Sequence, residues 1–329
     1  MSALAVERYC EPTFQHWNAF VERSNEGTLY HRLDFLAYHG ERFAADVHHL
    51  VWREHGAPMA VMPMALAPNE TRVARSPYGA SYGGPAFAEP PGYATSLAWV
   101  RSLLEHLQDA GAEQCVLTLP INCCYRVYTD TFRLALHEAG FRCVRREVSS
   151  AVCLDDRLPA HEPVACRAGA VLRRVRRAER HGIIGVHRAP PDAFWAVLEQ
   201  TFGRHQAKPT HTRQELEWLC DRLPDRVWLD VAYEKDRPVA GVAVFLVNDR
   251  TACSFYLCAD PERRQTQALT LLLVQAMALL RERHIGWLDF GTSSDAMRGR
   301  DSIFRFKEGF GAVGLFRETY EWRANGAIS

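Results

Sequence analysis

The sequence lacks net charge, a long apolar run and a leader-like N-terminus, and each absence excludes a class of protein. Its 39 Lys and Arg residues balance 39 Asp and Glu residues, so a nucleic-acid partner would need a local basic patch. The longest apolar segment, 268–280, is too short to span a membrane. Residues 1–14 include Glu7 and Glu11 but no apolar run, unlike a signal peptide. We therefore expect a cytoplasmic protein without a membrane span.

Paired metal-ligand and nucleophile patterns are also missing. The ten cysteines are scattered, with no Cys-x-x-Cys pair and no paired spacing with histidine, so we expect buried free thiols and no metal site. Neither a Gly-x-Ser-x-Gly turn nor a Cys–His nucleophile pattern is visible. If the chain transfers a chemical group, these absences favour direct transfer over a covalent intermediate.

The sequence does contain helix and strand patterns that occur twice in a similar order. Each half has helices, a strand pair, a further helix and further strands. Between the halves, 155–170 shifts to Pro, Ala and charged residues, which indicates a domain connection. Two α/β modules with mixed sheets fit this order, with sites at the ends of strands.

A strand, a turn and a long helix follow one another from residue 251, and such a turn can bind an anion at the helix N-terminus. In acetyl-CoA enzymes of the GNAT type the turn is R/Q-x-x-G-x-G/A, whose glycines let the backbone approach a pyrophosphate. The aligned residues are Arg263, Arg264, Gln265, Thr266, Gln267 and Ala268. Thr266 stands in place of a glycine, so phosphate binding would depend more on the arginine side chains. A charged surface turn is the alternative.

Several segments in a fixed order resemble the Fem-type (FemABX, FemAB-like) transferases of the GNAT superfamily. They are SPYGASYGGPAF, LRRVRRAERHGI, QTQALTLLLVQAMALLRERHIGWLDFGTSS and FRFKEGFGA. The resemblance implies two tandem GNAT-like domains with mixed, mostly antiparallel sheets. It implies an N-terminal acceptor-side domain at 1–155 and a donor-side domain at 156–314, with 315–329 returning to the first.

The resemblance places the lysine of a Phe-Lys-x-x-Phe-Gly motif at Lys307, between Phe306 and Gly309. In the family this lysine supports the donor ester or its phosphate. We expect it on a glycine-flanked loop, where its cation could lie beside an oxyanion. A surface lysine on a hairpin turn is the alternative. Asp289, inside an apolar strand, is a second catalytic candidate, although a buried structural carboxylate is the interpretation that we favour.

Candidate acceptor or phosphate contacts come from a Gly/Tyr-rich loop, a strand and an arginine-rich helix. They are Tyr78, Tyr82, Tyr256, Arg173, Arg176, Arg177 and Arg180. The arginines lie on one side of a helix and repel one another unless they meet anions such as phosphates. A solvated helix face and a turn packed by tyrosines are the alternatives. Ala88 stands where the family often has an aspartate, so the sequence does not identify a general base.

The resemblance and the residues together predict an amide-forming acyltransferase without a permanently bound cofactor. The leading hypothesis is transfer of an aminoacyl group from aminoacyl-tRNA to a small or peptidic amine, with possible contact to the tRNA acceptor stem. The second hypothesis is an N-acyltransferase that uses acetyl-CoA or another acyl-CoA. The third is a non-catalytic GNAT-fold protein that binds RNA or a metabolite.

Overall fold

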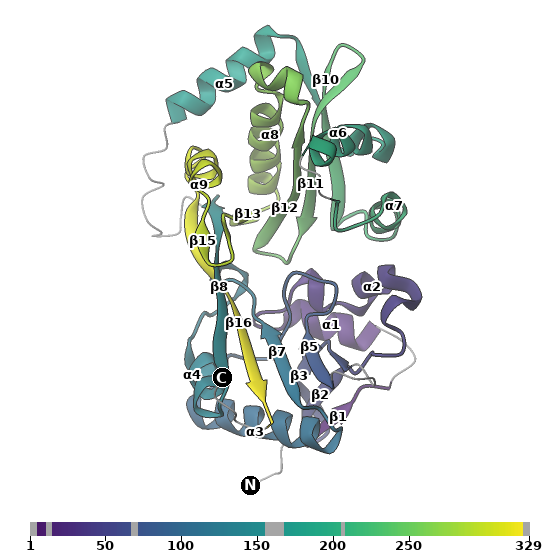
Figure 1. Cartoon of the computed structure of the whole chain (residues 1–329), viewed down its shortest axis with the longest axis vertical. Helices are drawn as coiled ribbons and strands as arrows, with labels where there is room; N and C mark the ends of the chain where they lie inside the picture. The colour runs from purple at the N-terminus through teal and green to yellow at the C-terminus, as the bar shows by residue number, and fades with distance from the viewer. Residues whose placement is uncertain (1–4, 11–14, 67–71, 155–167, 205–207, 325–329) are drawn as a thin grey trace. The chain divides into compact units, whose positions relative to one another are not determined.

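The structure is a computed structural model that describes residues 5–10, 15–66, 72–154, 168–204 and 208–324. The chain forms two compact units (Figure 1). Unit 1 comprises residues 1–147 and 316–329, and unit 2 comprises residues 148–315. Most of the connection predicted at 155–170 lies outside the described residues, which resume at 168.

Unit 1 has a four-stranded sheet, ordered β1-β2-β3-β6, and a second run of strands, ordered β4-β5-β7-β16. Its strands are β1 (Ala5–Arg8), β2 (Leu50–Glu54), β3 (Ala57–Met62), β4 (Ala65–Leu66), β5 (Val73–Ser76), β6 (Ala86–Phe87) and β7 (Gln114–Thr118). Its helices are α1 (Gln15–Arg23), η1 (Leu29–His31), α2 (Leu33–Leu36), η2 (Ala37–Phe43), α3 (Tyr93–Asp109), η3 (Asn122–Cys124) and α4 (Thr131–Glu138). The long strands β8 (Arg142–Cys153) and β16 (Val313–Arg323) each contribute residues to both units.

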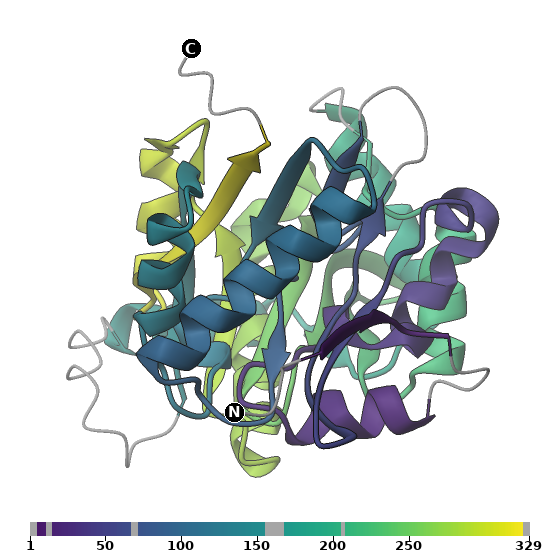
Figure 2. The same ribbon diagram turned by 90° about the horizontal axis from the view of Figure 1, so that it is seen from below.

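The helix α3 covers strands of unit 1 and connects a parallel pair. Its buried residues recur every three to four positions along one side, as expected for a helix with one apolar face; they are Ser96, Trp99, Val100, Leu103 and Leu107. This helix is the long blue one at the front of Figure 2. It joins β5 to β7, which pair in parallel along the whole of β5. Unit 1 is therefore built around a β-α-β crossover.

Unit 2 has its strands in the order β8-β13-β12-β11-β10-β9. Its own strands are β9 (Ile183–Val186), β10 (Val227–Glu234), β11 (Arg237–Leu246), β12 (Thr251–Ala259), β13 (Trp287–Thr292), β14 (Ser294–Asp295) and β15 (Arg298–Gly299). Its helices are α5 (Ala168–Arg180), α6 (Pro191–Arg204), α7 (Arg213–Arg222), η4 (Pro261–Thr266), α8 (Ala268–Glu282) and α9 (Asp301–Glu308). The α/β class with mixed, mostly antiparallel sheets is thus confirmed, since β5/β7 and β12/β13 are parallel and the other strand pairs described are antiparallel.

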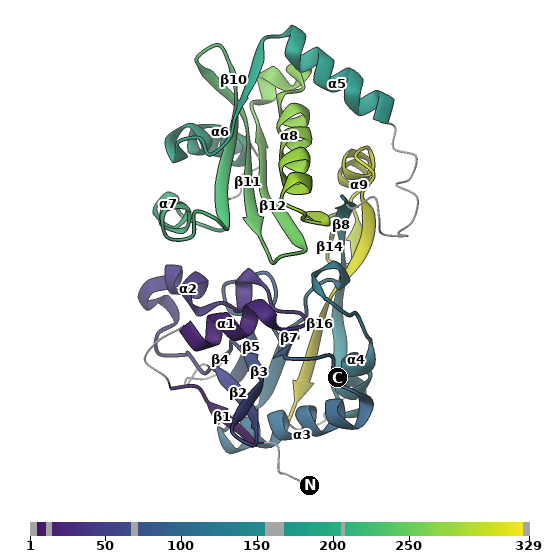
Figure 3. The same ribbon diagram turned by 180° about the vertical axis from the view of Figure 1, so that it is seen from behind.

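The sheet of unit 2 lies between helices (Figure 3). The apolar helix α8 packs against β9 to β12 on one face together with α5, while α6 packs on β10 to β12 from the other face. The core of the unit includes Leu272 and Leu280 of α8 and Val242 and Val244 of β11. The register of β11 against β12 shifts by one residue, because Ala243 pairs with Tyr256 whereas Val244 pairs with Ser254.

The parallel strands β12 and β13 separate after a short contact. They pair only over Thr251–Cys253 and Trp287–Asp289, although β12 continues to Ala259 and β13 to Thr292. Beyond the paired segment, β12 and β13 no longer form ladder pairs with each other, so the two strands separate there. The opening lies between strand ends, beside the turn that leads into α8.

The segment predicted as a loop around Lys307 is different in the structure. Asp301–Glu308 forms the helix α9, and Lys307 lies in its last turn. Gly309 has ordinary right-handed helical angles, and only Gly311 has a positive φ, of 86°. The loop prediction was wrong because the Gly-x-Gly pattern marks the end of a helix, where glycine permits the left-handed angles that close it.

Candidate functional site

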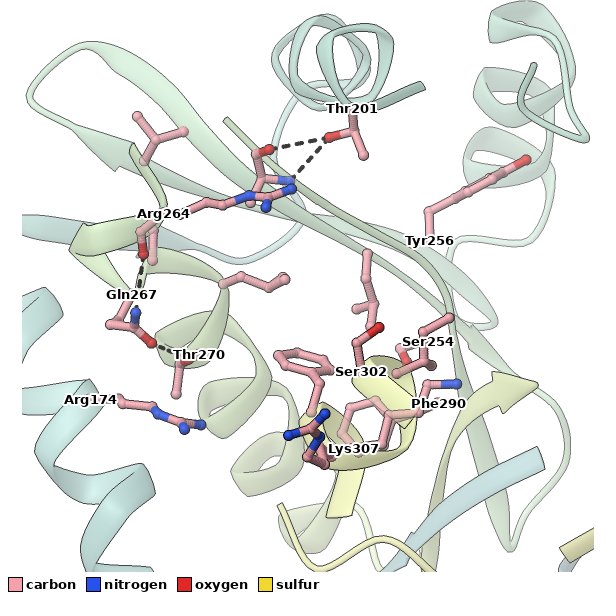
Figure 4. A pocket seen from close by; sticks show the side chains of 18 of the residues that line it. Arg174, Thr201, Ser254, Tyr256, Arg264, Gln267, Thr270, Phe290, Ser302 and Lys307 are labelled. Carbon is pink, nitrogen blue, oxygen red and sulfur yellow. Dashed lines mark hydrogen bonds between the residues drawn. The ribbon is translucent and has the colours of Figure 1, made fainter. Parts of the chain in front are cut away.

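Unit 2 contains a cavity of about 1020 Å³ where β12 and β13 separate (Figure 4). Side chains from α5, the turn η4, α8 and α9 complete its wall. The aromatic residues on the wall are Phe202, Phe255, Tyr256, Phe290 and Phe306, and its cationic residues are Arg174, Arg263, Arg264, Arg305 and Lys307. The described wall includes no Asp or Glu, so its charge favours a ligand that carries negative charge.

The turn before α8 presents Arg263, Arg264 and Gln267, which were predicted to bind the donor, to the cavity. The Nε of Arg263 lies 3.3 Å from Oε2 of Glu234, so this arginine is partly neutralised. Arg264 has neither an ion pair nor a hydrogen bond from its guanidinium among the described residues. Gln267 adopts left-handed angles (φ 63°, ψ 25°) and begins α8, as a glycine would do more readily.

Thr266, which replaces a glycine of the GNAT-type turn, does not line the cavity. It is 1% exposed, and its hydroxyl donates a 2.6 Å hydrogen bond to the carbonyl of Arg263. The extra side chain is therefore accommodated inside the turn. The neighbouring arginines and Gln267, but not Thr266, form this part of the cavity wall.

Lys307 borders the cavity but is held by backbone groups. Its Nζ donates to the carbonyls of Gly291 and Thr292, each at 2.7 Å, and the residue is only 5% exposed. Burial lowers the pKa of this amine to about 8, although the nearby Asp289 carboxylate acts in the opposite direction. An ammonium group has three donors, so one N–H remains beyond the two carbonyl contacts.

Asp289 is buried behind the cavity and does not line it. It is 2% exposed, and its Oδ1 accepts hydrogen bonds from Oγ of Ser149 at 2.6 Å and from the N–H of Gly291 at 2.8 Å. The carboxylate therefore fixes the backbone at Gly291, where Lys307 also binds. This geometry fits the structural interpretation of Asp289, as a residue that positions the lysine rather than one that contacts substrate.

Other predicted site residues of unit 2 differ in their access to the cavity. Phe306 and Tyr256 line it, and the Tyr256 hydroxyl accepts from the N–H of His211 at 3.0 Å. Gly309 does not line it, but a Cβ built on Gly309 would lie 3.8 Å from Nη1 of Arg174, so the glycine adjoins this arginine.

The two predicted tyrosines of the Gly/Tyr-rich loop belong to unit 1 and are buried. The Tyr78 hydroxyl lies 3.4 Å from Nε2 of His49. The Tyr82 ring packs edge-on against Tyr30, and the guanidinium of Arg317 lies 5.1 Å from its centre. These contacts match a turn packed by tyrosines, which was the alternative to a pocket lining.

The arginines predicted on one side of α5 lie outside the cavity. Arg173, Arg176 and Arg180 line a separate open depression with Glu179, and Arg177 is exposed. Arg174 lines the cavity and was missed as a site residue. Its position was detectable, because Arg174 is three residues after Val171 and four before Ala178, the buried positions of the helix.

The remaining polar residues on the cavity wall were not predicted. They are Thr201, Ser254, Thr270, Thr292, Ser302 and Arg305. No sequence motif marks them, because only the separation of β12 and β13 and the approach of α9 bring these segments together. The hydroxyls of Ser254 and Ser302 lie toward the α9 side of the cavity, near Lys307 (Figure 4).

The described residues contain neither a cluster of metal-binding side chains nor a helix that could span a membrane. They include no group of three His, Cys, Asp or Glu side chains arranged to hold a metal ion. None of the helices described has both the length and the apolar character needed to cross a membrane.

Comparisons with known proteins agree with this architecture. Residues 167–308 match a family model described as an acetyltransferase (GNAT) domain. The fold is similar to that of FemX, with a TM-score of 0.67 and 12% identity over 96% of this chain and 97% of FemX. No curated protein matches the chain.

Two other solved structures have a similar fold. The structure of L-PGS from Bacillus licheniformis has a TM-score of 0.60 and 15% identity, with 97% of this chain and 94% of that chain covered. A tandem GNAT protein from the clavulanic acid biosynthesis pathway has a TM-score of 0.56 and 12% identity, with 99% and 100% covered. The tandem GNAT-like fold that the resemblance implies is thus confirmed: residues 167–308 match a GNAT acetyltransferase domain model, and the whole chain has a fold similar to that of FemX and of a tandem GNAT protein.

Proposed function

We propose that this chain is an amide-forming acyltransferase that moves an aminoacyl group from aminoacyl-tRNA to a small or peptidic amine. The observation that carries the proposal is the continuity of positive charge along α5. Arg174 faces the cavity, while Arg173, Arg176 and Arg180 of the same helix face solvent beside an open depression. A donor with a chain of phosphates could contact both groups of arginines.

The transfer needs an oxyanion contact and a path for one proton. The acceptor nitrogen forms a bond to the ester carbonyl carbon, and the C–O bond to the ribose then breaks. The nitrogen releases one proton and the leaving oxygen gains one, so the reaction is balanced. The remaining N–H of Lys307 is suited to the developing oxyanion or a donor phosphate. Aromatic rings at Phe290 and Phe306 would exclude water from the ester.

A second candidate function is acyl transfer from an acyl-CoA. One observation favours it: the described cavity wall has no carboxylate that could pair with the α-ammonium of an aminoacyl group. An acetyl group carries no such charge. The match of residues 167–308 to an acetyltransferase domain also supports this candidate.

Thermal unfolding with each donor distinguishes the two candidates. We expect a mixture of aminoacyl-tRNAs to raise the melting temperature of the protein, because a ligand that binds only the folded state stabilises it. Deacylated tRNA at the same concentration and ionic strength is the control for contacts to the phosphate backbone. If acetyl-CoA raises the melting temperature while charged tRNA has no effect, the aminoacyl-tRNA proposal fails and the acyl-CoA candidate takes its place.

A further inference from the structure

We propose that Arg174 binds a phosphate group of the donor inside the cavity, a role that the other arginines of α5 do not share. The inference rests on the proposed transfer from a phosphate-bearing donor and holds for either carrier, a tRNA terminus or coenzyme A. The sequence pattern predicted phosphate contacts for the arginines on the opposite side of α5, whereas we assign such a contact to Arg174.

The placement of Arg174 follows from the packing of α5. This helix packs on α8, and its buried positions are Val171 and Ala178. Because Arg174 shares their side of the helix, its side chain extends along the contact between α5 and α8 toward α9. Nη1 would lie 3.8 Å from a Cβ on Gly309, which directly follows α9. Figure 4 shows the guanidinium at the cavity, below Thr270.

The charges on the wall indicate where an anion would bind. Arg263 is next to Glu234, Arg305 pairs with Asp301 on its own helix, and Lys307 is bonded to backbone carbonyls. The cations left are Arg174 and Arg264, for which the described residues supply no ion pair or side-chain hydrogen bond.

Guanidinium groups of this kind are suited to phosphate. Each presents a planar set of N–H donors that can bind two oxygens of one phosphate group. Arg174 comes from α5 and Arg264 from the turn before α8, so they supply two positive charges from different parts of the wall. Each of them could bind one phosphate group of a donor that carries several phosphates.

The matched variants Arg174→Gln and Arg173→Gln test the inference. Both remove one positive charge from neighbouring, exposed positions of α5, but only Arg174 lines the cavity. Calorimetric titration would use coenzyme A and deacylated tRNA as probes. We expect Arg174→Gln to raise the Kd at least tenfold for the probe that the wild type binds, and Arg173→Gln to raise it less than threefold. Arg174→Lys should recover part of the affinity, because it restores the charge without the planar geometry.

Failure of the Arg174 assignment can be distinguished from failure of the proposed function. If the wild type binds one probe and both Gln variants weaken it equally, or Arg174→Gln has no effect, the assignment of Arg174 is wrong while the donor proposal stands. If the wild type binds neither probe, the inference and the proposed function are both overturned. Equal melting temperatures of the variants and the wild type would establish that a change in Kd reflects a lost contact.

Discussion

Lys307 is bound to the protein backbone, and this limits what it can do in a reaction. Two of its three N–H donors are used by the carbonyls of Gly291 and Thr292, and the neighbouring N–H of Gly291 is fixed by Asp289. The amine therefore has a fixed position at the cavity wall. Such preorganisation suits an electrostatic role, because the charge need not be reoriented during the reaction.

Replacement of Lys307 should affect both activity and stability. We expect Lys307→Ala to lose most turnover and to lower the free energy of unfolding by roughly 1–3 kcal/mol, because two carbonyls lose a charged donor. Kinetics with the accepted donor, together with denaturant unfolding, would measure the two effects separately. Full activity in Lys307→Ala would show that the lysine is structural only.

Glu26 in unit 1 is a buried acid whose surroundings favour its neutral form. It is 3% exposed, and its Oε2 has no hydrogen-bond partner among the described residues. Burial raises the pKa of this carboxyl to about 8, although contacts with Asn25 and Phe87 and the charge of Arg133 lower it in part. The folded protein therefore keeps a proton on Glu26 at pH values where the unfolded chain has released it.

This raised pKa predicts a pH-dependent effect of Glu26→Gln. The stabilisation by the neutral acid is fully present below about pH 4.5 and is lost as the pH rises through about 8. The glutamine variant has no such loss, so its advantage should increase between pH 5 and pH 9, to roughly 2–4 kcal/mol. Urea unfolding of both proteins across this range is the measurement. Parallel stability curves for the two proteins would contradict the assignment.

At the scale of elements, the length of strand pairing decides where a cavity forms. In unit 1, β5 pairs with β7 along its full length, from Val73 to Ser76. In unit 2, β12 pairs with β13 only over Thr251–Cys253, and the remainder of β12 borders the cavity. Both pairs are joined by a helix, but only the second leaves strand ends that a ligand could contact.

The strand β16 supports unit 1 through its C-terminal half. Thr319–Arg323 pairs with β7, and Tyr320 and Trp322 belong to the core of the unit. Glu318 accepts from Arg133 at 3.1 Å. Because both partners are largely buried, this ion pair is less screened than a surface pair would be.

Removal of this half-strand should damage unit 1 and spare donor binding. A chain that ends at Leu315 loses the β7 partner and the two aromatic core residues, whereas all described cavity residues lie between 174 and 307. We expect faster proteolysis within residues 5–147, with the Kd for the donor probe changed less than threefold. A chain that ends at Ala324 is the control. Unchanged proteolysis of the Leu315 chain would refute the structural role of β16.

At the scale of the whole molecule, the two units share an α/β architecture but differ in the surroundings of their predicted site residues. The GNAT domain match covers 167–308, which includes the whole described wall of the cavity. In unit 1, the corresponding Gly/Tyr-rich segment is packed by buried rings, including Tyr78 and Tyr82. A donor role for unit 2 and an acceptor role for unit 1 both stay predictions.

The sequence by itself determined the fold class and the position of the turn before α8. The periodic apolar positions of α3 and α8 identified helices, because burial on one side of a helix repeats every three to four residues. Apolar segments bounded by turn residues identified the β2–β3 hairpin and the strands β10 to β12. The residue patterns alone indicated two similar α/β modules, and the resemblance to the Fem-type transferases identified them as tandem GNAT-like units.

Only the tertiary structure decided which charged groups face the cavity. Lys307 was found from its motif, but its helical setting and its backbone partners depend on β13, which is close to α9 only in the folded chain. Arg174 faces the cavity and Arg173 does not, although they are neighbours of the same type in the sequence. Packing of α5 on α8 selects one of them, since a helix turns its successive residues by about 100°.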